Sequence, residues 1–227
     1  MRAPEALLNE IAEIPGMESG SKRLVILMTQ LGDFDSLEYA QALAPALPKL
    51  EQAGIKTLAI GIGDAAGAER FCQFTGFPRS NLKVEAEPRL HRGLGLYAGL
   101  QTPGGPWPGL LLMCAGIGSP GTLSEVFRGY TGDRTAPQRF DSPLFRLAGG
   151  DGFQRPFELA TVRLRNMTEV LGKWRTYVPQ DDFITQRGAT YLLDADDALL
   201  YQHLDRGMLG FSATMNRPLS FLDPYLD

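Results

Sequence analysis

Residues 23–43 read RLVILMTQLGDFDSLEYAQAL, and the architecture of the chain can be worked out from them. Residues 24–28 are all apolar, which is typical of a short buried strand. From Leu37 onward, apolar residues recur at the three-to-four spacing of a helix face. The polar loop at 32–36 joins these two patterns. The sequence therefore predicts a strand over 23–29 that passes through this loop into a helix.

The same order of elements repeats directly downstream. We expect the first helix to run over 37–53, with a kink where Pro45 and Pro48 interrupt its hydrogen bonds. A second buried strand is predicted at 56–62, and Asp64 is a natural N-cap for the helix after it. A strand–helix–strand–helix order with right-handed crossovers makes the two strands parallel.

The rest of the chain is less regular, apart from its end. Alternating apolar residues around an acidic turn predict a closing hairpin. The whole pattern indicates an α/β domain with a mixed central sheet. The further expected elements are a short helix over 4–16, a strand at 82–85, a helix over 89–98, a loop at 101–109, helical periodicity at 109–128 and 156–172, irregular structure at 129–152, hairpin strands at 189–193 and 198–203, and a short helix or extended tail at 208–227.

Composition narrows the functional classes. The chain has 227 residues, of which 44% are hydrophobic and 21% charged, as in an ordinary globular protein. A net charge of -4 argues against non-specific nucleic-acid binding. No run approaches the about 18 apolar residues of a membrane span, and residues 1–17 do not resemble a signal peptide. Two cysteines and two histidines predict neither a disulfide scaffold nor a metal or cofactor site. We therefore expect a soluble protein of a reducing compartment.

Similarity to a known family is found in three segments: 24–43, 67–99 and 185–207. They resemble the AhpC/TSA-type peroxiredoxin-like proteins, and the last one is similar to the family's Q-Q-G-G hairpin. The resemblance implies a single thioredoxin-like α/β domain over 1–227, with 132–179 as a large insertion before the C-terminal hairpin. It also implies antioxidant thiol chemistry.

The place where that chemistry would occur departs from the family pattern. Family members carry G-C-x-x-C where this chain has the loop at 32–36. Here Asp33 takes the first cysteine position and Ser36 the second. A carboxylate or a hydroxyl cannot replace the thiolate that reacts with peroxides or disulfides. Asp33, Asp35 and Ser36 are instead expected to cap the following helix and to interact favourably with its dipole.

The two cysteines offer one alternative reactive thiol. Cys72 could act as a one-cysteine peroxidatic site, with Arg70 stabilising its thiolate. A free cysteine in the middle of a helix more commonly packs as a small apolar residue. Cys114 lies in the apolar run 111–115 and is expected to be inert.

A glycine-rich turn at 114–121 allows two interpretations. Its backbone could form a weak anion-binding nest around Gly116, Gly118, Ser119 and Gly121. The simpler interpretation is a turn in which Ser119 or Thr122 caps the next helix.

The insertion at 132–179 carries aromatic and arginine side chains, as protein interfaces commonly do. The candidate partner-binding residues are Arg155, Phe157, Trp174, Arg175 and Tyr177. The same side chains could equally pack the insertion onto its own domain.

Two functional hypotheses follow. The first is a redox-degenerate protein that binds or assembles a partner protein complex. Residues 30–43 and 114–134 resemble cyanobacterial and plastid family members, which implies a photosynthetic partner and a cytoplasmic or stromal location, with peripheral contact to the thylakoid left open. The second is an antioxidant thiol peroxidase that uses Cys72.

Overall fold

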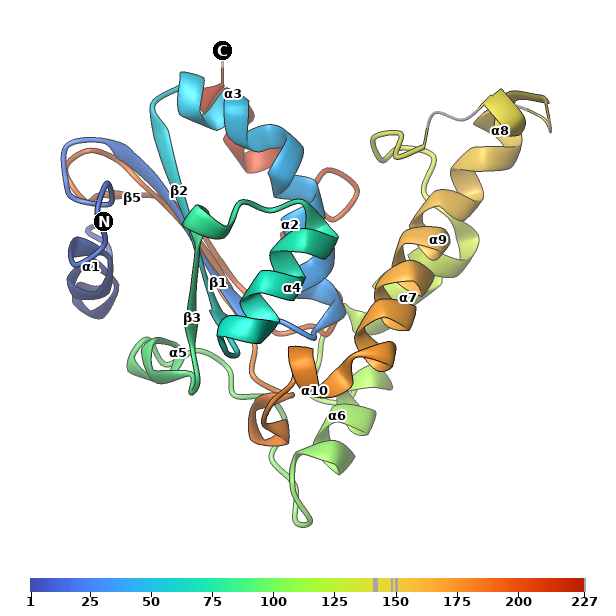
Figure 1. Ribbon diagram of the computed structural model, residues 1–227, viewed down its shortest axis with the longest axis horizontal. Coiled ribbons are helices and arrows are strands. Elements are labelled where there is room, and N and C mark those ends of the chain that lie inside the picture. The colour runs from blue at the N-terminus through green and yellow to red at the C-terminus, as the bar shows by residue number, and fades with distance from the viewer. Residues whose placement is uncertain (141–142, 148, 150, 227) are drawn as a thin grey trace.

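The computed structural model describes residues 1–140, 143–147, 149 and 151–226. Five strands form one sheet in the order β3-β2-β1-β4-β5, with helices on both faces (Figure 1). The predicted α/β fold with a mixed central sheet is therefore confirmed. The strands are β1 (Lys22–Gln30), β2 (Ile55–Ile62), β3 (Leu82–Glu85), β4 (Ala189–Leu193) and β5 (Leu199–Leu204).

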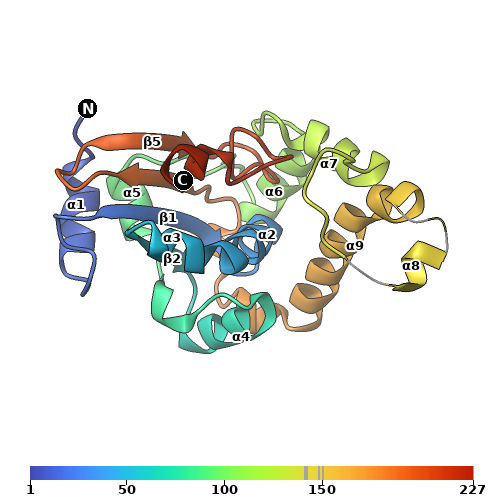
Figure 2. The ribbon, with the colours of Figure 1, turned by 90° about the horizontal axis from the view of Figure 1, so that it is seen from above.

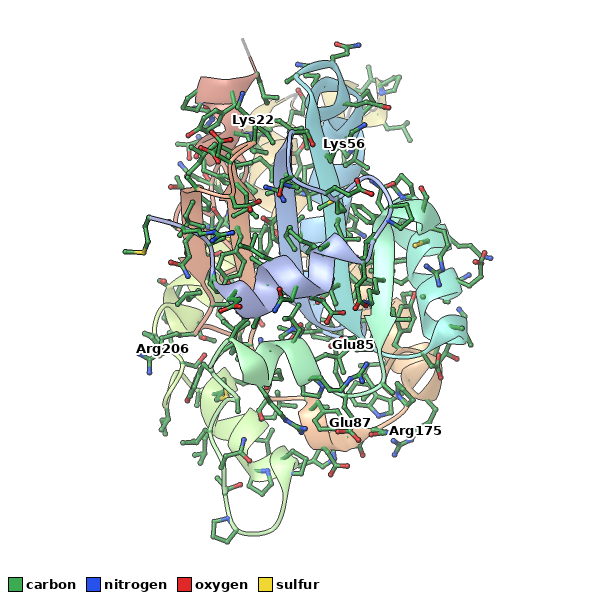
Figure 3. The ribbon with its side chains drawn as sticks, turned by 90° about the vertical axis from the view of Figure 1, so that its left-hand side faces the viewer. Lys22, Lys56, Glu85, Glu87, Arg175 and Arg206 are labelled. Atoms are coloured by element: carbon green, nitrogen blue, oxygen red, sulfur yellow. The ribbon has the colours of Figure 1, made fainter. Side chains whose placement is uncertain are left out.

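Strand direction sets the position of the loop after β1. β1, β2 and β3 are parallel, whereas β4 runs antiparallel to β1 and β5 antiparallel to β4. Lys22 and Lys56 accordingly lie together at one end of the sheet, and Glu85 lies at the other (Figure 3). The loop after Gln30 therefore emerges at the carboxyl end of the parallel strands, where binding sites commonly form in such sheets.

Helices cover the two faces of the sheet unequally. Figure 1 shows α1 and α5 on one side and α2, α3 and α4 on the other. The helices around the sheet are α1 (Glu5–Ala12), α2 (Phe34–Leu43), α3 (Leu47–Gln52), α4 (Ala65–Thr75) and α5 (Arg89–Gly93), with short 3-10 turns η1 (Ala44–Ala46), η2 (Arg79–Asn81), η3 (Asp181–Phe183) and η4 (Ser220–Tyr225).

Alternation along β1 divides its side chains between two cores. Leu24, Ile26 and Met28 pack on the side of α2 and α4, and Val25 and Leu27 pack on the side of α1. All five are at most 3% exposed. Because β1 is buried on both faces, consecutive residues along it are apolar, and this continuous apolar run is what predicted the strand from the sequence.

The remaining helices form a helical arm, here defined as α6 to α10. Figure 2 shows α8 and α9 at the opposite end of the molecule from α1. The arm reaches the sheet region through α6, α10 and part of α9. Its helices are α6 (Pro106–Cys114), α7 (Thr122–Thr131), α8 (Pro143–Leu147), α9 (Asp151–Gly172) and α10 (Trp174–Tyr177).

Several predicted boundaries need correction. The helix expected over 37–53 begins at Phe34, and the predicted kink at Pro45 and Pro48 divides it into α2, η1 and α3. The helix expected over 89–98 ends at Gly93. The one over 4–16 is shorter, and the tail consists of turns and bends followed by η4 at Ser220–Tyr225. The hairpin and the strand at 82–85 lie where they were predicted.

The arm differs most from the sequence-based expectation. The run at 109–128 is two helices, because the glycine-rich turn divides it and α6 already begins inside the predicted loop at 101–109. The stretch at 129–152, expected to be irregular, contains the end of α7, all of α8 and the start of α9. Residues 141, 142, 148 and 150 of the insertion lie outside the described residues. Within the described residues, no helix is long and apolar enough to cross a membrane.

Candidate functional site

Asp33 lies at the junction of β1 and α2, where a reactive thiol was expected. It is the N-cap of α2, and its Oδ1 accepts a hydrogen bond of 3.0 Å from the backbone N–H of Asp35. This satisfies one of the free N–H groups of the first helical turn, and the positive end of the helix dipole favours the carboxylate. The predicted capping role of Asp33 is confirmed.

Arg187 neutralises this carboxylate. Its Nη2 donates to Asp33 Oδ2 at 2.6 Å, and the arginine side chain has no exposed surface. Its other donors contact the backbone carbonyls of Ile184, Thr185 and Gly207. Sequence reasoning missed Arg187, although an arginine directly before the apolar strand β4 was a usable signal, since arginine is rarely buried unless it is paired.

Two further buried carboxyl groups surround the pair. Asp35 is 4% exposed, and its Oδ2 accepts from Gly210 N–H at 3.0 Å. Its Oδ1 has no hydrogen-bond partner among the described residues. Asp205 is also buried, with the Nε2 of His203 at an ion-pair distance of 3.1 Å. Burial raises the pKa of Asp35, and the negative charges of Asp33 and Asp205 raise it further against the opposing effect of Arg187. Arg187 pairs with Asp33, and His203 lies at ion-pair distance from Asp205. The raised pKa of Asp35 favours its protonated form.

Ser36 does not cap α2. Its Oγ lies 2.8 Å from Thr29 Oγ1 on β1, and the residue is buried. His91 is engaged elsewhere, because its Nε2 contacts the Met28 carbonyl and burial lowers its pKa to about 4. Ser36 thus lacks the adjacent base that a serine nucleophile needs. No group of three or more His, Cys, Asp or Glu side chains suited to a metal ion occurs in the described part of the chain.

The two cysteines differ in exposure, but neither has a lowered pKa. Cys72 is only 9% exposed within the core around α4, and burial raises its pKa. Arg70 does not stabilise its thiolate, because the guanidinium of Arg70 pairs with Glu169 at 2.6 Å. Cys114 is exposed at the end of α6, which corrects the expectation of an inert apolar position. Partial burial of its thiol, together with the charge of Asp33, raises its pKa as well.

The glycine-rich turn uses its polar groups internally. The N–H of Gly116 donates to Met113, and that of Ser119 donates to Gly116. Ser119 is buried, with its Oγ 2.5 Å from Thr122 Oγ1. The N-cap of α7 is Gly121, not Ser119 or Thr122. Its φ of 86° is one that only glycine adopts freely. These contacts favour the turn interpretation over an anion nest at Gly116, Gly118, Ser119 and Gly121.

The five candidate partner residues are placed very differently from one another. Tyr177 is fully buried and donates to Glu169 at 3.0 Å. Arg155 contacts Glu158 and the carbonyls of Arg134 and Ala136 inside the arm. Neither side chain is therefore presented to a partner. Phe157 is 56% exposed, Arg175 is exposed in an ion pair with Asp181, and the half-buried Trp174 lies 5.5 Å from the Trp107 ring.

The side of α9 that faces the rest of the molecule carries both apolar and polar residues. Val170 is fully buried in the core on the side of α2 and α4. Arg163 pairs with the buried Glu38 of α2 at 3.2 Å, and Asn166 exchanges hydrogen bonds with Gln41. Glu169 pairs with Arg70 of α4, which lowers the pKa of this glutamate to about 2.

The opposite side of α9 and one side of α7 are apolar and exposed. Phe127 is 65% exposed, Tyr130 84% and Leu164 59%. Monomeric proteins rarely expose large apolar patches unless the patches bind something. The part on α7 was missed in the sequence, although its spacing of four and three residues is that of a helix face. We name this surface the apolar stripe; it consists of Leu123, Phe127 and Tyr130 on α7 and Phe157, Leu164, Met167 and Leu171 on α9.

Three parallel strands, crossover helices and a closing antiparallel hairpin define a thioredoxin-like fold. A family model described as AhpC/TSA antioxidant enzyme matches residues 42–207, which is more than half of the chain. The chain therefore belongs to the AhpC/TSA antioxidant enzyme family. Searches of curated proteins and of solved structures gave no match. The matched residues begin after Asp33 and Ser36, so the assignment of these two to the cysteine positions rests on their place at the junction of β1 and α2.

Proposed function

We propose that this chain is a redox-degenerate member of the AhpC/TSA family that acts as a binding module for a partner protein. The orientation of α9 carries this proposal. A helix that packs on its own domain normally turns its apolar residues inward and polar residues outward. α9 buries Leu159 and Val170 in this way, yet it also exposes Leu164 and Leu171 on its opposite side. The partner would bury the outward side.

The junction of β1 and α2 supports the loss of redox chemistry. Asp33 is occupied as a helix cap and as the partner of Arg187, and Ser36 is occupied by Thr29. Neither can form the thiolate that the family's chemistry uses. The junction then contributes rigidity, while recognition belongs to the arm.

The rim of the apolar stripe indicates the chemistry of the partner. Arg165 is exposed on α9 beside Leu164, whereas Lys173 and Arg175 pair with Glu169 and Asp181. An amphipathic helix with a carboxylate placed to meet Arg165 would complement this surface. We propose that 1–227 is one domain, in which the insertion 132–179 and the preceding helix α7 form the recognition surface. The resemblance to cyanobacterial and plastid proteins makes a photosynthetic complex the particular candidate, contacted from the cytoplasm or stroma at the thylakoid periphery.

The alternative, a peroxidase that uses Cys72, has no specific observation in its favour. A peroxidatic thiol must be accessible and must have a lowered pKa. Cys72 is buried, and its pKa is raised. The binding hypothesis is therefore preferred.

A matched pair of variants tests the proposal. Phe127→Ser with Leu164→Ser removes two exposed side chains from the apolar stripe. Leu200→Ser with Leu204→Ser removes two exposed leucines from β5, outside the stripe. We expect the stripe variant to capture at least about tenfold less partner from an extract of the source cells, since truncated interface anchors commonly cost more than about 1 kcal/mol each. Quantitative mass spectrometry after affinity capture measures the difference.

The β5 variant should capture the partner as the wild type does, and thermal unfolding should show both variants folded. Trp174→Ala is a further variant, in which an arm residue outside the apolar stripe is changed and capture is compared with that of the stripe variant. Equal capture by the stripe and β5 variants would contradict the proposal. So would unfolding of the stripe variant, because its side chains would then belong to the core.

A further inference from the structure

A groove of about 750 Å³ lies between the arm and the helices that cover the sheet. Its walls come from α2, the end of α4, the loop after α7, part of α9 and the C-terminal segment, which the reader can follow in Figure 2. This volume is within the about 300–1,000 Å³ that ligand sites commonly have. Gln73, Gly76 and Gln138 on the walls are exposed, so the groove is open to solvent. Its apolar lining includes Phe74, Phe140, Val162, Leu219 and Leu222.

Arginine dominates the charge of this groove. Among the described residues that line it, the ionisable side chains are Arg139, Arg165, Arg217 and Asp223. Arg217 and Asp223 pair with each other at 2.7 Å. The other two arginines give the described part of the groove a net positive charge.

Arg165 presents its guanidinium to the groove. The guanidinium lies 5.0 Å from the centre of the Phe74 ring, and Phe74 is itself part of the groove wall. The residue is exposed, and it forms no ion pair or hydrogen bond with any described residue. Stacking on a ring uses one face of a guanidinium and leaves the N–H donors in its plane free to bind a carboxylate.

Arg139 adds a second set of donors. Within the described part of the chain its one ion pair is with Glu38 at 3.7 Å, which is longer than a hydrogen bond. Glu38 is also bound by Arg163 at 3.2 Å, so Arg139 can bind another carboxylate without leaving Glu38 unpaired. A guanidinium can hold a carboxylate through two parallel hydrogen bonds, which makes the contact strong and directional.

The end of α4 supplies a different kind of polar group. Thr75 is the last residue of this helix, and both Thr75 and its C-cap Gly76 line the groove. The last carbonyls of a helix lack partners within the helix and carry partial negative charge. A simple anion is disfavoured beside them, whereas a peptide brings N–H donors as well as carboxylates. Clusters of arginine are a recurring means of recognising acidic peptide motifs.

We propose that this groove binds an extended acidic peptide segment with apolar residues between its carboxylates. The carboxylates pair with Arg165 and Arg139, and the apolar side chains pack against Phe140 and Leu219. Arg165 also borders the apolar stripe, so the segment is assigned to the same partner protein. That assignment rests on the proposed function, but the binding of a peptide to the groove does not.

Fluorescence anisotropy tests the groove without the natural partner. The probe is the peptide amide Glu-Phe-Glu-Leu-Glu labelled with a neutral dye, and the control peptide has glutamine in place of each glutamate. We expect saturable binding of the probe and binding at least about tenfold weaker for the control peptide, because charge-assisted hydrogen bonds are lost. Binding of the probe should weaken as the ionic strength rises.

Variants locate the binding site. Arg165→Gln and Arg139→Gln should each weaken binding of the acidic probe at least about tenfold. Arg206→Gln is the matched control, because Arg206 is also exposed and stacked on an aromatic ring, 5.1 Å from the centre of Tyr97, but does not line the groove. It should bind the probe as the wild type does. The stripe variant should also bind it normally, so the two proposals fail separately.

Equal binding of the two peptides would overturn the proposal, and so would equal losses in Arg165→Gln and Arg206→Gln. Displacement of the probe by inorganic phosphate at the same concentration would indicate a simple anion site and would overturn it as well. Thermal unfolding verifies that each variant is folded. If Arg139→Gln does not fold, Arg165→Gln decides the matter, because this exposed side chain pairs with no described carboxylate.

Discussion

At the level of single residues, Asp35 makes the stability of this protein depend on pH. It is buried beside Asp33 and Asp205, and Arg187 is the cation that opposes their effect on its pKa. Its pKa is raised by burial, so the folded protein keeps this proton at pH values where the unfolded chain has lost it. Stability from this group is then fully present below the unfolded pKa of about 3.9 and is lost as the pH rises through the folded pKa.

Asp35→Asn should therefore raise the melting temperature at pH 8 and have little effect near pH 4. The amide oxygen can still accept from Gly210 N–H, while the buried charge is gone. Thermal unfolding followed by circular dichroism across this pH range measures the change. Asp196→Asn, at the exposed hairpin turn, is the control and should show no such pH dependence. A melting difference for Asp35→Asn that stays constant with pH would contradict the buried-charge explanation.

At the level of elements, α9 is attached by polar contacts as well as by the buried side chains of Leu159 and Val170. Arg163 joins three helices, since its guanidinium contacts Glu38 of α2 and both the side chain and backbone of Glu125 on α7. The Glu38 side chain is 2% exposed, and its other ion-pair partner, Arg139, is 3.7 Å away. Loss of Arg163 would leave this buried carboxylate poorly compensated.

We expect Arg163→Met to destabilise the protein by about 3 kcal/mol, the usual cost of breaking a buried ion pair from one side. Amide hydrogen exchange should become faster in α7 and α9 and change less in β1, which has its own apolar core on both faces. Arg217→Met is the matched control, because the Arg217–Asp223 pair is more than half exposed on both sides. It should cost no more than about 0.5 kcal/mol. Similar losses in the two variants would show that Arg163 does not fasten the arm.

At the level of the whole molecule, the chain keeps the fold of its family, but its own two thiols, Cys72 and Cys114, are in unreactive surroundings. Cys72 lies on the buried side of α4, and Cys114 lies at the end of α6 in the arm. The pKa of each thiol is raised. A raised pKa lowers the thiolate fraction and with it the rate of attack on a peroxide.

The purified protein should therefore consume hydrogen peroxide no faster than a free thiol, even with a thioredoxin reducing system present. Cys72→Ser and Cys114→Ser should behave as the wild type does. Turnover that disappears in Cys72→Ser would restore the peroxidase hypothesis. Turnover that disappears in Cys114→Ser would instead place a reactive thiol beside Asp33.

Much of the sheet side of this molecule was predictable because its signals are local. The apolar run of β1, the alternation in the hairpin and the caps at Asp33 and Asp64 depend on neighbours within a few residues. The arm was harder to predict, because a glycine-rich turn divides one periodic run into α6 and α7. Proline is common at the first position of a helix, so the sequence placed the start of this helix at Pro156. In the structure Pro156 lies inside α9, which begins at Asp151.

Taken alone, the sequence specifies the strands, the hairpin, the helix caps at Asp33 and Asp64 and the absence of cysteine at the junction of β1 and α2. Tertiary structure decides the rest of the candidate site. Arg187 and Asp33 meet across 154 positions of sequence, and Cys114 approaches the same junction only because α6 folds back onto it. Periodicity shows that α9 carries apolar residues but not which of them are buried. Val170 is buried and Leu164 is exposed because Glu38, Gln41 and Arg70 on other helices bind Arg163, Asn166 and Glu169 of α9.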